Sequence, residues 1–340
     1  MKVLMICGSY PPEHCGIGDY AYQLVRNLEI QGNEVVVMAN IDWSVKNFFS
    51  IIKNVRVINA DVIHIQYPGI NYQLSIMPQL ISLFFRSFVT THEVSQIHFV
   101  RKLSLIPFAL RSKVVFTNIF ERDRFVKLFP WFRKKNTVII PIGSNINANE
   151  EILVENKRIN EIISFGQIRP DKGIEQVINL SKRIKENELP YRIIIVGQLL
   201  PKFKQYFNKL KELSIDLDIE WKLNLPESGI STILSSSLIA YLPYPDGVSE
   251  RRGSLLASLK NQMFVITTDG QQATQDLKDC VHIVSDNTDV IDFLKNNNED
   301  SIVKILESKK ELSNAYMARL EWPNIAMEHI KNYIPHSKEG

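Results

Sequence analysis

Cysteine is scarce in this sequence: only Cys7, Cys15 and Cys280 occur among 340 residues. They form no CxxC pair, which excludes a disulfide framework and a cysteine-based zinc site. So few cysteines suit a reduced compartment. We therefore expect a cytoplasmic protein without a bound metal.

Long apolar runs are also missing. The most apolar stretch beyond the N-terminus, residues 74–89, is interrupted by Pro78 and Arg86 and is too short to span a bilayer. The opening MKVLMICGSYPP has one lysine and a short apolar run, which predicts a buried first strand rather than a secretory signal. Repeats of solenoid length and low-complexity segments are absent, which excludes repeat and disordered classes.

What is present is the ordinary composition of a globular protein, with 45% hydrophobic and 23% charged residues. At this length two domains are expected, because a single core rarely grows so large. Short β-branched runs alternate with helix-period segments such as 17–31 and 119–129, which is typical of parallel sheets covered on both faces. The expected strands are residues 2–7, 34–39, 62–66, 88–92, 113–117 and 137–141, then 161–166, 192–197, 218–221, 238–242, 264–267 and 281–284.

These two series predict an α/β protein of two Rossmann-like, doubly wound domains that face each other across a cleft. Residues 1–150 form the first domain and residues 158–320 the second, with a polar linker over 143–157. A last helical stretch begins at Trp322 without a preceding strand. We expect residues 322–340 to pack back on the first domain.

The charge is uneven along the chain. Residues 1–150 carry 16 lysines and arginines against 10 acidic residues, although the whole chain has a net charge of only +3. Aromatic and basic residues alternate over 125–135 (FVKLFPWFRKK), and 101–113 is also basic. The segment 101–135 is therefore either ordinary surface or a contact with an anionic membrane, which would place the protein on the inner face of that membrane. No nucleic-acid signature accompanies it, so nucleic acid is not an expected partner.

Candidate functional residues follow the strands, because ligands bind at the carboxyl ends of parallel strands. Arg169 and Lys172 lie in one loop before a helix, where a fork and a point charge can hold a diphosphate together; Asp171 between them allows the alternative of a solvated helix start. His92 follows its strand directly and is either a core histidine or a ligand contact. Glu250 stands before a helix that opens near Ser254, and the neighbouring Arg251 and Arg252 are expected to keep its carboxylate ionised.

Gly16 and Gly18 precede the first helix in a G-x-G-x-x-A pattern that resembles a dinucleotide fingerprint. That fingerprint needs a tight turn directly after the strand, whereas two prolines and several other residues intervene here. A longer loop that brings a substrate to the helix N-terminus fits better. Asp216 and Asp218 imitate a metal-binding DxD, but they precede a strand and so lie on the wrong side of the sheet.

Taken in order, these motifs resemble the family 4 retaining glycosyltransferases of the GT-B fold. PPEHCGIGDYAYQLVRNLEIQGNEVVVMA is similar to their opening loop and first helix, and SFGQIRPDKGIEQVI to the start of their second domain. VIIPIGSNI resembles their interdomain segment, with Ile142 and Asn145 as departures. The stretch from Glu321 and Trp322 onward resembles their closing helix.

The resemblance implies transfer of a hexosyl-type sugar from a nucleotide-sugar donor to a glycan or lipid-linked acceptor in polysaccharide biosynthesis. It implies retention of configuration and no cofactor or metal. The second domain would bind the donor and the first the acceptor. His92, Arg169, Lys172 and Glu250 would be the catalytic residues. The donor would be bound by Gly16, Gly18, Gly166, Arg169, Lys172, Gly253 and Ser254.

One departure concerns the paired glutamates of the family. Aligning on VITTD places Ser249 and Ala257 at their positions, with Glu250 one residue out of register. SERRGSLL resembles a variant found in some of these enzymes. The missing carboxylate at Ala257 favours an alternative, a catalytically inactive protein that binds a sugar nucleotide or a partner enzyme. An NAD-linked oxidoreductase is a third alternative.

Overall fold

Two parallel six-stranded sheets organise the chain, and the computed structural model assigns them to two units. The model describes residues 1–340 except 14, 95–101, 133–135, 149–156 and 334–340. One unit contains Met1–Gly143 and the chain from Leu320 onward, and the other contains Ser144–Arg319. Of the predicted linker, residues 149–156 lie outside the described part of the chain.

The sheet of the first unit has the order β2-β1-β3-β4-β5-β6. Successive residues of its strands serve opposite faces: Val3 and Met5 pack in one core cluster, and Leu4 and Ile6 in another. This explains why the strands read as continuous apolar runs. The strands are β1 (Lys2–Ile6), β2 (Glu34–Met38), β3 (Val62–Tyr67), β4 (Ser87–Thr91), β5 (Ser112–Phe116) and β6 (Thr137–Ile139).

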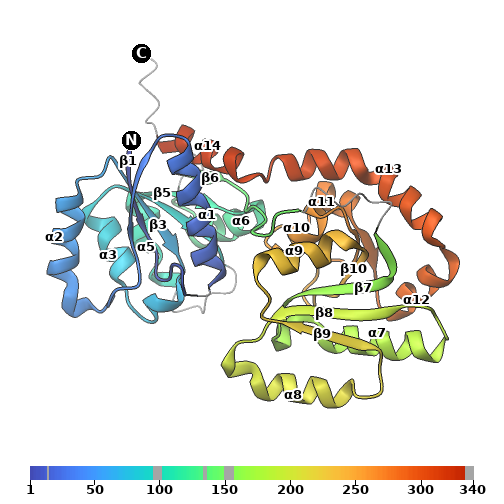
Figure 1. Ribbon diagram of the computed structural model, residues 1–340. Coiled ribbons are helices and arrows are strands. Elements are labelled where there is room, and N and C mark those ends of the chain that lie inside the picture. The colour runs from blue at the N-terminus through green and yellow to red at the C-terminus, as the bar shows by residue number, and fades with distance from the viewer. Residues whose placement is uncertain (14, 95–101, 133–135, 149–156, 334–340) are drawn as a thin grey trace. The chain divides into compact units, whose positions relative to one another are not determined.

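Helices cover both faces of this sheet (Figure 1). One cluster packs α1 (Gly16–Ile30) and α14 (Trp322–Tyr333) against the strands, so the closing helix returns to the first unit. The residues after Tyr333 lie outside the described part. The other cluster holds α2 (Phe48–Ile58), α3 (Met77–Phe84), α5 (Ile106–Arg111) and α6 (Ile119–Leu128), with the short helices η1 (Val45–Asn47) and η2 (Ile70–Tyr72) in the connecting loops.

The sheet of the second unit has the order β12-β11-β10-β7-β8-β9. Its strands are β7 (Arg158–Gln167), β8 (Arg192–Gln198), β9 (Ile219–Leu223), β10 (Ser237–Leu242), β11 (Phe264–Thr268) and β12 (His282–Val284). Its helices are η5 (Pro170–Lys172), α7 (Ile174–Glu186), η6 (Pro201–Phe203), α8 (Lys204–Leu213), α9 (Glu227–Ser236), α10 (Gly253–Lys260), α11 (Gln275–Cys280), α12 (Asn287–Asn296) and α13 (Glu299–Ala318). Within this unit, α7 and α8 lie on one side of the sheet and α9, α10 and α11 on the other (Figure 1).

In both sheets the strand order changes direction at one point, which we call the reversal point. Ligands of doubly wound proteins bind at this point. The strand order turns between β1 and β3 in the first unit, and between β7 and β10 in the second. The predicted α/β class and all the predicted strands are confirmed, with ends that differ by at most three residues. No helix among the described residues is long and apolar enough to cross a membrane.

Candidate functional site

The loop after β7 is fixed by a glycine. Gly173, the residue before α7, has a φ of +70°, and a Cβ atom there would lie 1.9 Å from the carbonyl oxygen of Pro243. Neither the backbone conformation nor the space admits another residue. Gly173 therefore holds the loop that carries Lys172 directly against the loop that follows β10.

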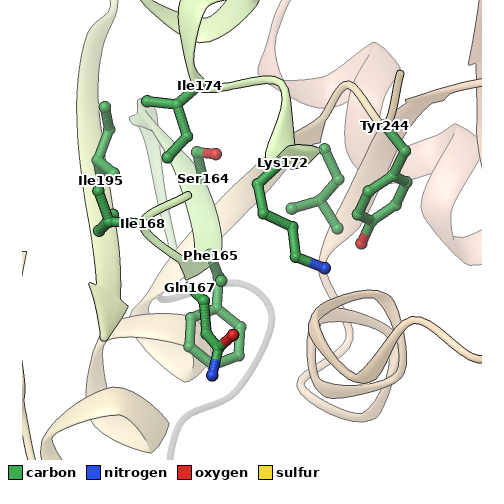
Figure 2. Close-up of a pocket in the computed structure, with 10 residues that line it drawn as sticks. Ser164, Phe165, Gln167, Ile168, Lys172, Ile174, Ile195 and Tyr244 are labelled. Atoms are coloured by element: carbon green, nitrogen blue, oxygen red, sulfur yellow. The ribbon is translucent and has the colours of Figure 1, made fainter. Parts of the chain in front are cut away.

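A pocket opens at this crossing, at the carboxyl ends of β7 and β10. Figure 2 shows the side chain of Lys172 extending into it, with its amino group and the hydroxyl of Tyr244 turned toward the same region. The pocket thus occupies the reversal point of the second sheet. Its lining residues are Ser164, Phe165, Gly166, Gln167, Ile168, Lys172, Ile174, Ile195, Leu242 and Tyr244.

The positive charge of the Lys172 ammonium group is not fully balanced by nearby acidic groups. Burial and the positive charges of Arg252 and Arg169 together lower its pKa to about 8, against the opposing effect of Asp171 and Asp246. A cation that is partly desolvated and repelled by other cations is stabilised by a bound anion. The pocket therefore has the electrostatics of an anion-binding site.

Arg169 lies near Lys172, as predicted, but its guanidinium already has a carboxylate partner. Its Nε is 2.7 Å from Oδ1 of Asp171, and its Nη2 donates to Oδ2 of the same residue at 2.8 Å. The alternative role of Asp171, as a dipole cap on the following helix, is replaced by this ion pair. Arg169 adds charge to the pocket while Asp171 orients it.

Arg252 is a further cation at this site and is not among the residues predicted to form it. Its guanidinium lies 4.6 Å from the centre of the Tyr244 ring and forms an ion pair with Asp246. Its Nε is buried without a hydrogen-bond partner in the described structure, so one donor of this cation is unsatisfied. The sequence feature that could have indicated it is the Arg251-Arg252 pair before a helix, but this pair was assigned only to the environment of Glu250.

The N-terminus of α10 lies beside the pocket, next to Tyr244 and Gly166. Ser254, in its first turn, shares a 2.7 Å hydrogen bond with the Tyr244 hydroxyl, and its Oγ is 4.0 Å from the position that a Cβ on Gly166 would occupy. Gly253 opens the helix, and a Cβ there would meet nothing within 4 Å. Gly166, Lys172 and Ser254 are thus brought together. Ala257, one turn later, is completely buried.

The expected environment of Glu250 is wrong. The sequence suggested that Arg251 and Arg252 keep this carboxylate ionised, but Arg251 donates to Gln272 and Arg252 to Asp246. Glu250 instead accepts a 2.8 Å hydrogen bond from Thr274, and burial raises its pKa despite this bond and the charge of Arg319. Adjacent side chains in a loop point in different directions, so adjacency in sequence gave no ion pair. Glu250 does not line the Lys172 pocket.

In the first unit, Gly16 and Gly18 differ in role. Gly18 is buried in α1, where a Cβ would lie 2.9 Å from the carbonyl oxygen of Ser9, so this glycine allows the helix to pack on the loop after β1. Gly16 is exposed at the helix start, and a Cβ there would meet nothing within 4 Å. Gly16 can therefore face a ligand, whereas Gly18 is required for close packing of the helix on the loop.

His92 follows β4 and is 7% exposed. Its backbone N–H donates to the carbonyl oxygen of Tyr67 at 2.9 Å, and its Nε2 lies 3.0 Å from Oε1 of Gln66. These contacts fix the imidazole beside the reversal point of the first sheet, where β3 also ends.

The described residues contain no group of three or more potential metal ligands. Asp216 and Asp218 precede β9, at the amino end of that strand. Their position agrees with the argument that set the DxD pattern aside.

The interpretation of 125–135 as an exposed aromatic surface is wrong for most of its aromatics. Phe125, Phe129 and Phe132 are at most 4% exposed and pack on one another, with ring centres 4.9 and 5.2 Å from Phe125. Phe125 lies in α6, whereas Phe129 and Phe132 follow the last residue of that helix, Leu128, and the loop there brings their rings against Phe125. Trp131 alone of the segment's aromatics is exposed, at 52%. Residues 101 and 133–135 lie outside the described residues.

Comparison with known proteins agrees with this architecture. Residues 145–298 match the family model of glycosyl transferases group 1. No curated protein sequence matches the chain.

Several solved structures share the fold over nearly the whole chain. A glycosyltransferase from Rickettsia africae ESF-5 is 15% identical, with a TM-score of 0.68 and coverage of 98% of this chain and 97% of that one. HepE from Anabaena, solved with UDP and glucose, is 12% identical, with a TM-score of 0.71 and coverage of 98% and 99%. The catalytic domain of starch synthase IV from Arabidopsis thaliana, bound to ADP and acarbose, is 11% identical, with a TM-score of 0.66 and coverage of 97% and 98%. At these identities the likeness establishes the GT-B fold.

The lowered pKa of Lys172 predicts how anion binding depends on pH. As pH rises through about 8, Lys172 loses its charge. The affinity for a nucleoside diphosphate should therefore fall about tenfold between pH 7 and 9.5, a range in which the diphosphate keeps its charge. Isothermal titration calorimetry measures this directly. The variant Lys172→Arg should bind without the step, because its guanidinium stays charged. A step that persists in Lys172→Arg would assign the titration to another group.

Proposed function

Because residues 145–298 belong to the glycosyl transferases group 1 family and the whole chain has the GT-B fold, we propose that this protein is a retaining glycosyltransferase. It moves a hexosyl-type sugar from a nucleotide-sugar donor to a glycan or lipid-linked acceptor in polysaccharide biosynthesis. The observation that carries the proposal is the cationic pocket around Lys172 at the reversal point of the second sheet.

The donor diphosphate binds in this pocket. The ammonium of Lys172, the guanidinium groups of Arg252 and Arg169, and the N-terminus of α10 at Gly253 and Ser254 face its negative charge. The absence of a side chain at Gly166 leaves room for the phosphates beside Ser254. The UDP and ADP held by the related Anabaena and Arabidopsis structures support a nucleoside diphosphate as leaving group.

The reaction requires these positive charges next to the bond between the sugar and the diphosphate. The bond between the anomeric carbon and the phosphate oxygen breaks, and its electron pair stays on the diphosphate. The acceptor hydroxyl oxygen bonds to the same carbon and gives its proton to the departing phosphate. Lys172 and Arg252 stabilise the charge that develops on the leaving group, which is electrostatic catalysis without a metal.

The remaining predicted residues receive more limited roles. His92 contacts the transferred sugar, the amides near Gly16 assist in binding the donor, and the first unit binds the acceptor. Glu250 is tied to Thr274, so we assign its carboxylate to anchoring the loop that leads to α10 rather than to the reacting atoms. Ala257 is buried in α10, so the ribose is held by groups other than a carboxylate at that position.

Donor hydrolysis separates an enzyme from an inactive sugar-nucleotide-binding protein of the same fold. A screen of UDP-, GDP- and ADP-sugars should find one that is hydrolysed, and the rate should persist in excess EDTA because protein cations neutralise the diphosphate. Lys172→Gln should lower kcat/KM at least tenfold. The control Lys182→Gln, which removes an exposed α7 lysine paired with Glu186, should leave it unchanged.

Two results would contradict this account. Complete loss of hydrolysis in EDTA, restored by magnesium or manganese, would assign the charge neutralisation to a metal. Binding of a donor without hydrolysis or transfer would identify the inactive alternative.

We place the membrane contact that was predicted for residues 101–135 on another surface of the first unit. Side chains exposed on α2, α3 and α5 include Phe49 and Val57, Leu83 and Phe84, and Ile106 and Leu110. The ring of Phe48 joins two of these helices, with its centre 5.3 Å from Phe49 and 5.5 Å from Phe84. We refer to this surface as the α2–α3–α5 face.

The basic residues around this face indicate that its partner is anionic. Lys46, Lys53, Arg56, Arg86 and Arg111 are exposed around it. Between Trp43 and Phe120 the only acidic residues in the sequence are Asp61 and Glu93. Apolar side chains among exposed basic residues, which outnumber the acidic residues of this stretch, fit an anionic lipid surface, to which each basic residue contributes about 1 kcal/mol. We propose that this face holds the protein on such a membrane.

Vesicle binding tests the assignment. At low salt the protein should sediment with vesicles that contain anionic lipid and not with neutral ones. The double variant Phe49→Ser, Phe84→Ser should lose most of this binding. The control pair Leu213→Ser, Ile215→Ser removes apolar side chains that are 63% and 81% exposed on the second unit and should bind normally. Wild-type protein that ignores anionic vesicles would make the face ordinary surface.

A further inference from the structure

A buried polar cluster lies behind His92 in the first unit. Gln66, on β3, is fully buried, and its side-chain oxygen lies 3.0 Å from Nε2 of His92. Its amide nitrogen lies 3.3 Å from Nε2 of His64, two residues earlier on the same face of the strand. The carboxamide therefore connects two imidazoles.

The cluster continues into the closing helix. The Nδ1 of His64 is 2.5 Å from the hydroxyl of Tyr333, and its Nε2 is 2.7 Å from Oγ1 of Thr90. The helix α14 supplies a second member, His329, whose Nε2 is 3.0 Å from the hydroxyl of Tyr20. The ring of Tyr20 in turn meets that of His92 edge-on, with ring centres 4.8 Å apart. Both routes from α14 thus end at His92.

Burial keeps His64 and His329 uncharged. It holds the pKa of His64 well below its ordinary value and lowers that of His329 to about 3. Neutral imidazoles each have one donor and one acceptor, so hydrogen-bond partners decide where the proton sits. With the Gln66 oxygen facing His92, the His92 proton is on Nε2. With the Gln66 amide and the Thr90 hydroxyl facing Nε2 of His64, the His64 proton is on Nδ1 and is donated to Tyr333.

Burying such a cluster in a core is unfavourable in free energy compared with burying apolar side chains. Each of its polar groups loses water on folding, and a carboxamide without partners costs several kcal/mol. Apolar residues would pack the same space without that requirement. The hydrogen bonds of the cluster fix the orientation of the side chains that they join, because each bond restricts both of its partners. The Nδ1 of His329 is buried without a hydrogen-bond partner among the described residues.

We propose that Gln66 is a positioning residue for His92 and that Tyr333 on α14 holds it through His64. Gln66 directs the Nε2 proton of His92 inward and so fixes the orientation of the ring and the nitrogen that carries the proton. The closing helix thereby acts on a residue that, by the proposed function, contacts the transferred sugar. The network itself is independent of that function.

The ¹⁵N shifts of histidine report the tautomer of each ring, and they test the proposal without activity. Wild-type protein should show His92 with its proton on Nε2. In Gln66→Leu, which keeps similar volume without hydrogen bonds, this preference should be lost. Tyr333→Phe should weaken it. The control Tyr72→Phe removes a buried hydroxyl that has no hydrogen-bond partner in the described part of the same unit, and it should leave the spectrum of His92 unchanged.

Kinetics then connects the tautomer to catalysis. Gln66→Leu should lower kcat for donor hydrolysis about tenfold or more, because a misoriented contact is lost at the reacting sugar. Nucleoside diphosphate affinity, which belongs to the second unit, should stay within about twofold. A purely structural role would lower stability without this separation of kcat from affinity. If Gln66→Leu does not fold, Tyr333→Phe carries both measurements.

The outcomes separate the two proposals. An unchanged His92 tautomer in the folded variants, or a changed tautomer with an unchanged kcat, would overturn the positioning role. The expected tautomer shifts in a protein that transfers no sugar would support the network and contradict the proposed function.

Discussion

The contact between Gly173 and the carbonyl group of Pro243 is the constraint on which the donor site depends. Two loops, one after β7 and one after β10, meet at the reversal point of the second sheet with no room for a Cβ between them. Because they are locked together there, Lys172 on one loop lies near Arg252 on the other. The fold thus forces like charges into proximity, which is unfavourable until an anion arrives.

That unfavourable proximity explains the chemistry of the pocket. The acidic residues Asp171 and Asp246 hold Arg169 and Arg252 in place but do not cancel the effect on Lys172, whose pKa stays low. A diphosphate that gains negative charge as it leaves is the ligand such a site stabilises most in the transition state. Preorganised cations and a helix N-terminus supply this stabilisation without reorganisation at the moment of reaction. The same groups thus serve donor binding and departure of the leaving group.

Much of this arrangement could be predicted from the sequence because it follows from local rules. Short β-branched runs gave the strands, and the rule that ligands bind at strand carboxyl ends placed Gly166, Lys172 and Ser254 in one neighbourhood. The sequence failed where side-chain direction decides. Glu250 and Arg252 are two residues apart, yet one contacts Thr274 and the other Asp246. The phenylalanines of 125–132 looked like a surface pattern, but the loop after α6 turns Phe129 and Phe132 into the core beside Phe125. The partners of His92 were beyond reach, since Gln66 and Tyr333 come from distant segments that meet only in the folded unit.

The structure of this protein with a bound nucleoside diphosphate tests the central claim most directly. The account predicts that the two phosphates lie in the pocket of the second unit, within hydrogen-bond distance of the Lys172 amino group and the first amides of α10, with the Arg252 guanidinium beside them. A diphosphate bound instead to the Gly16 loop of the first unit, or held in the second unit by a metal ion and without contact to Lys172, would contradict it.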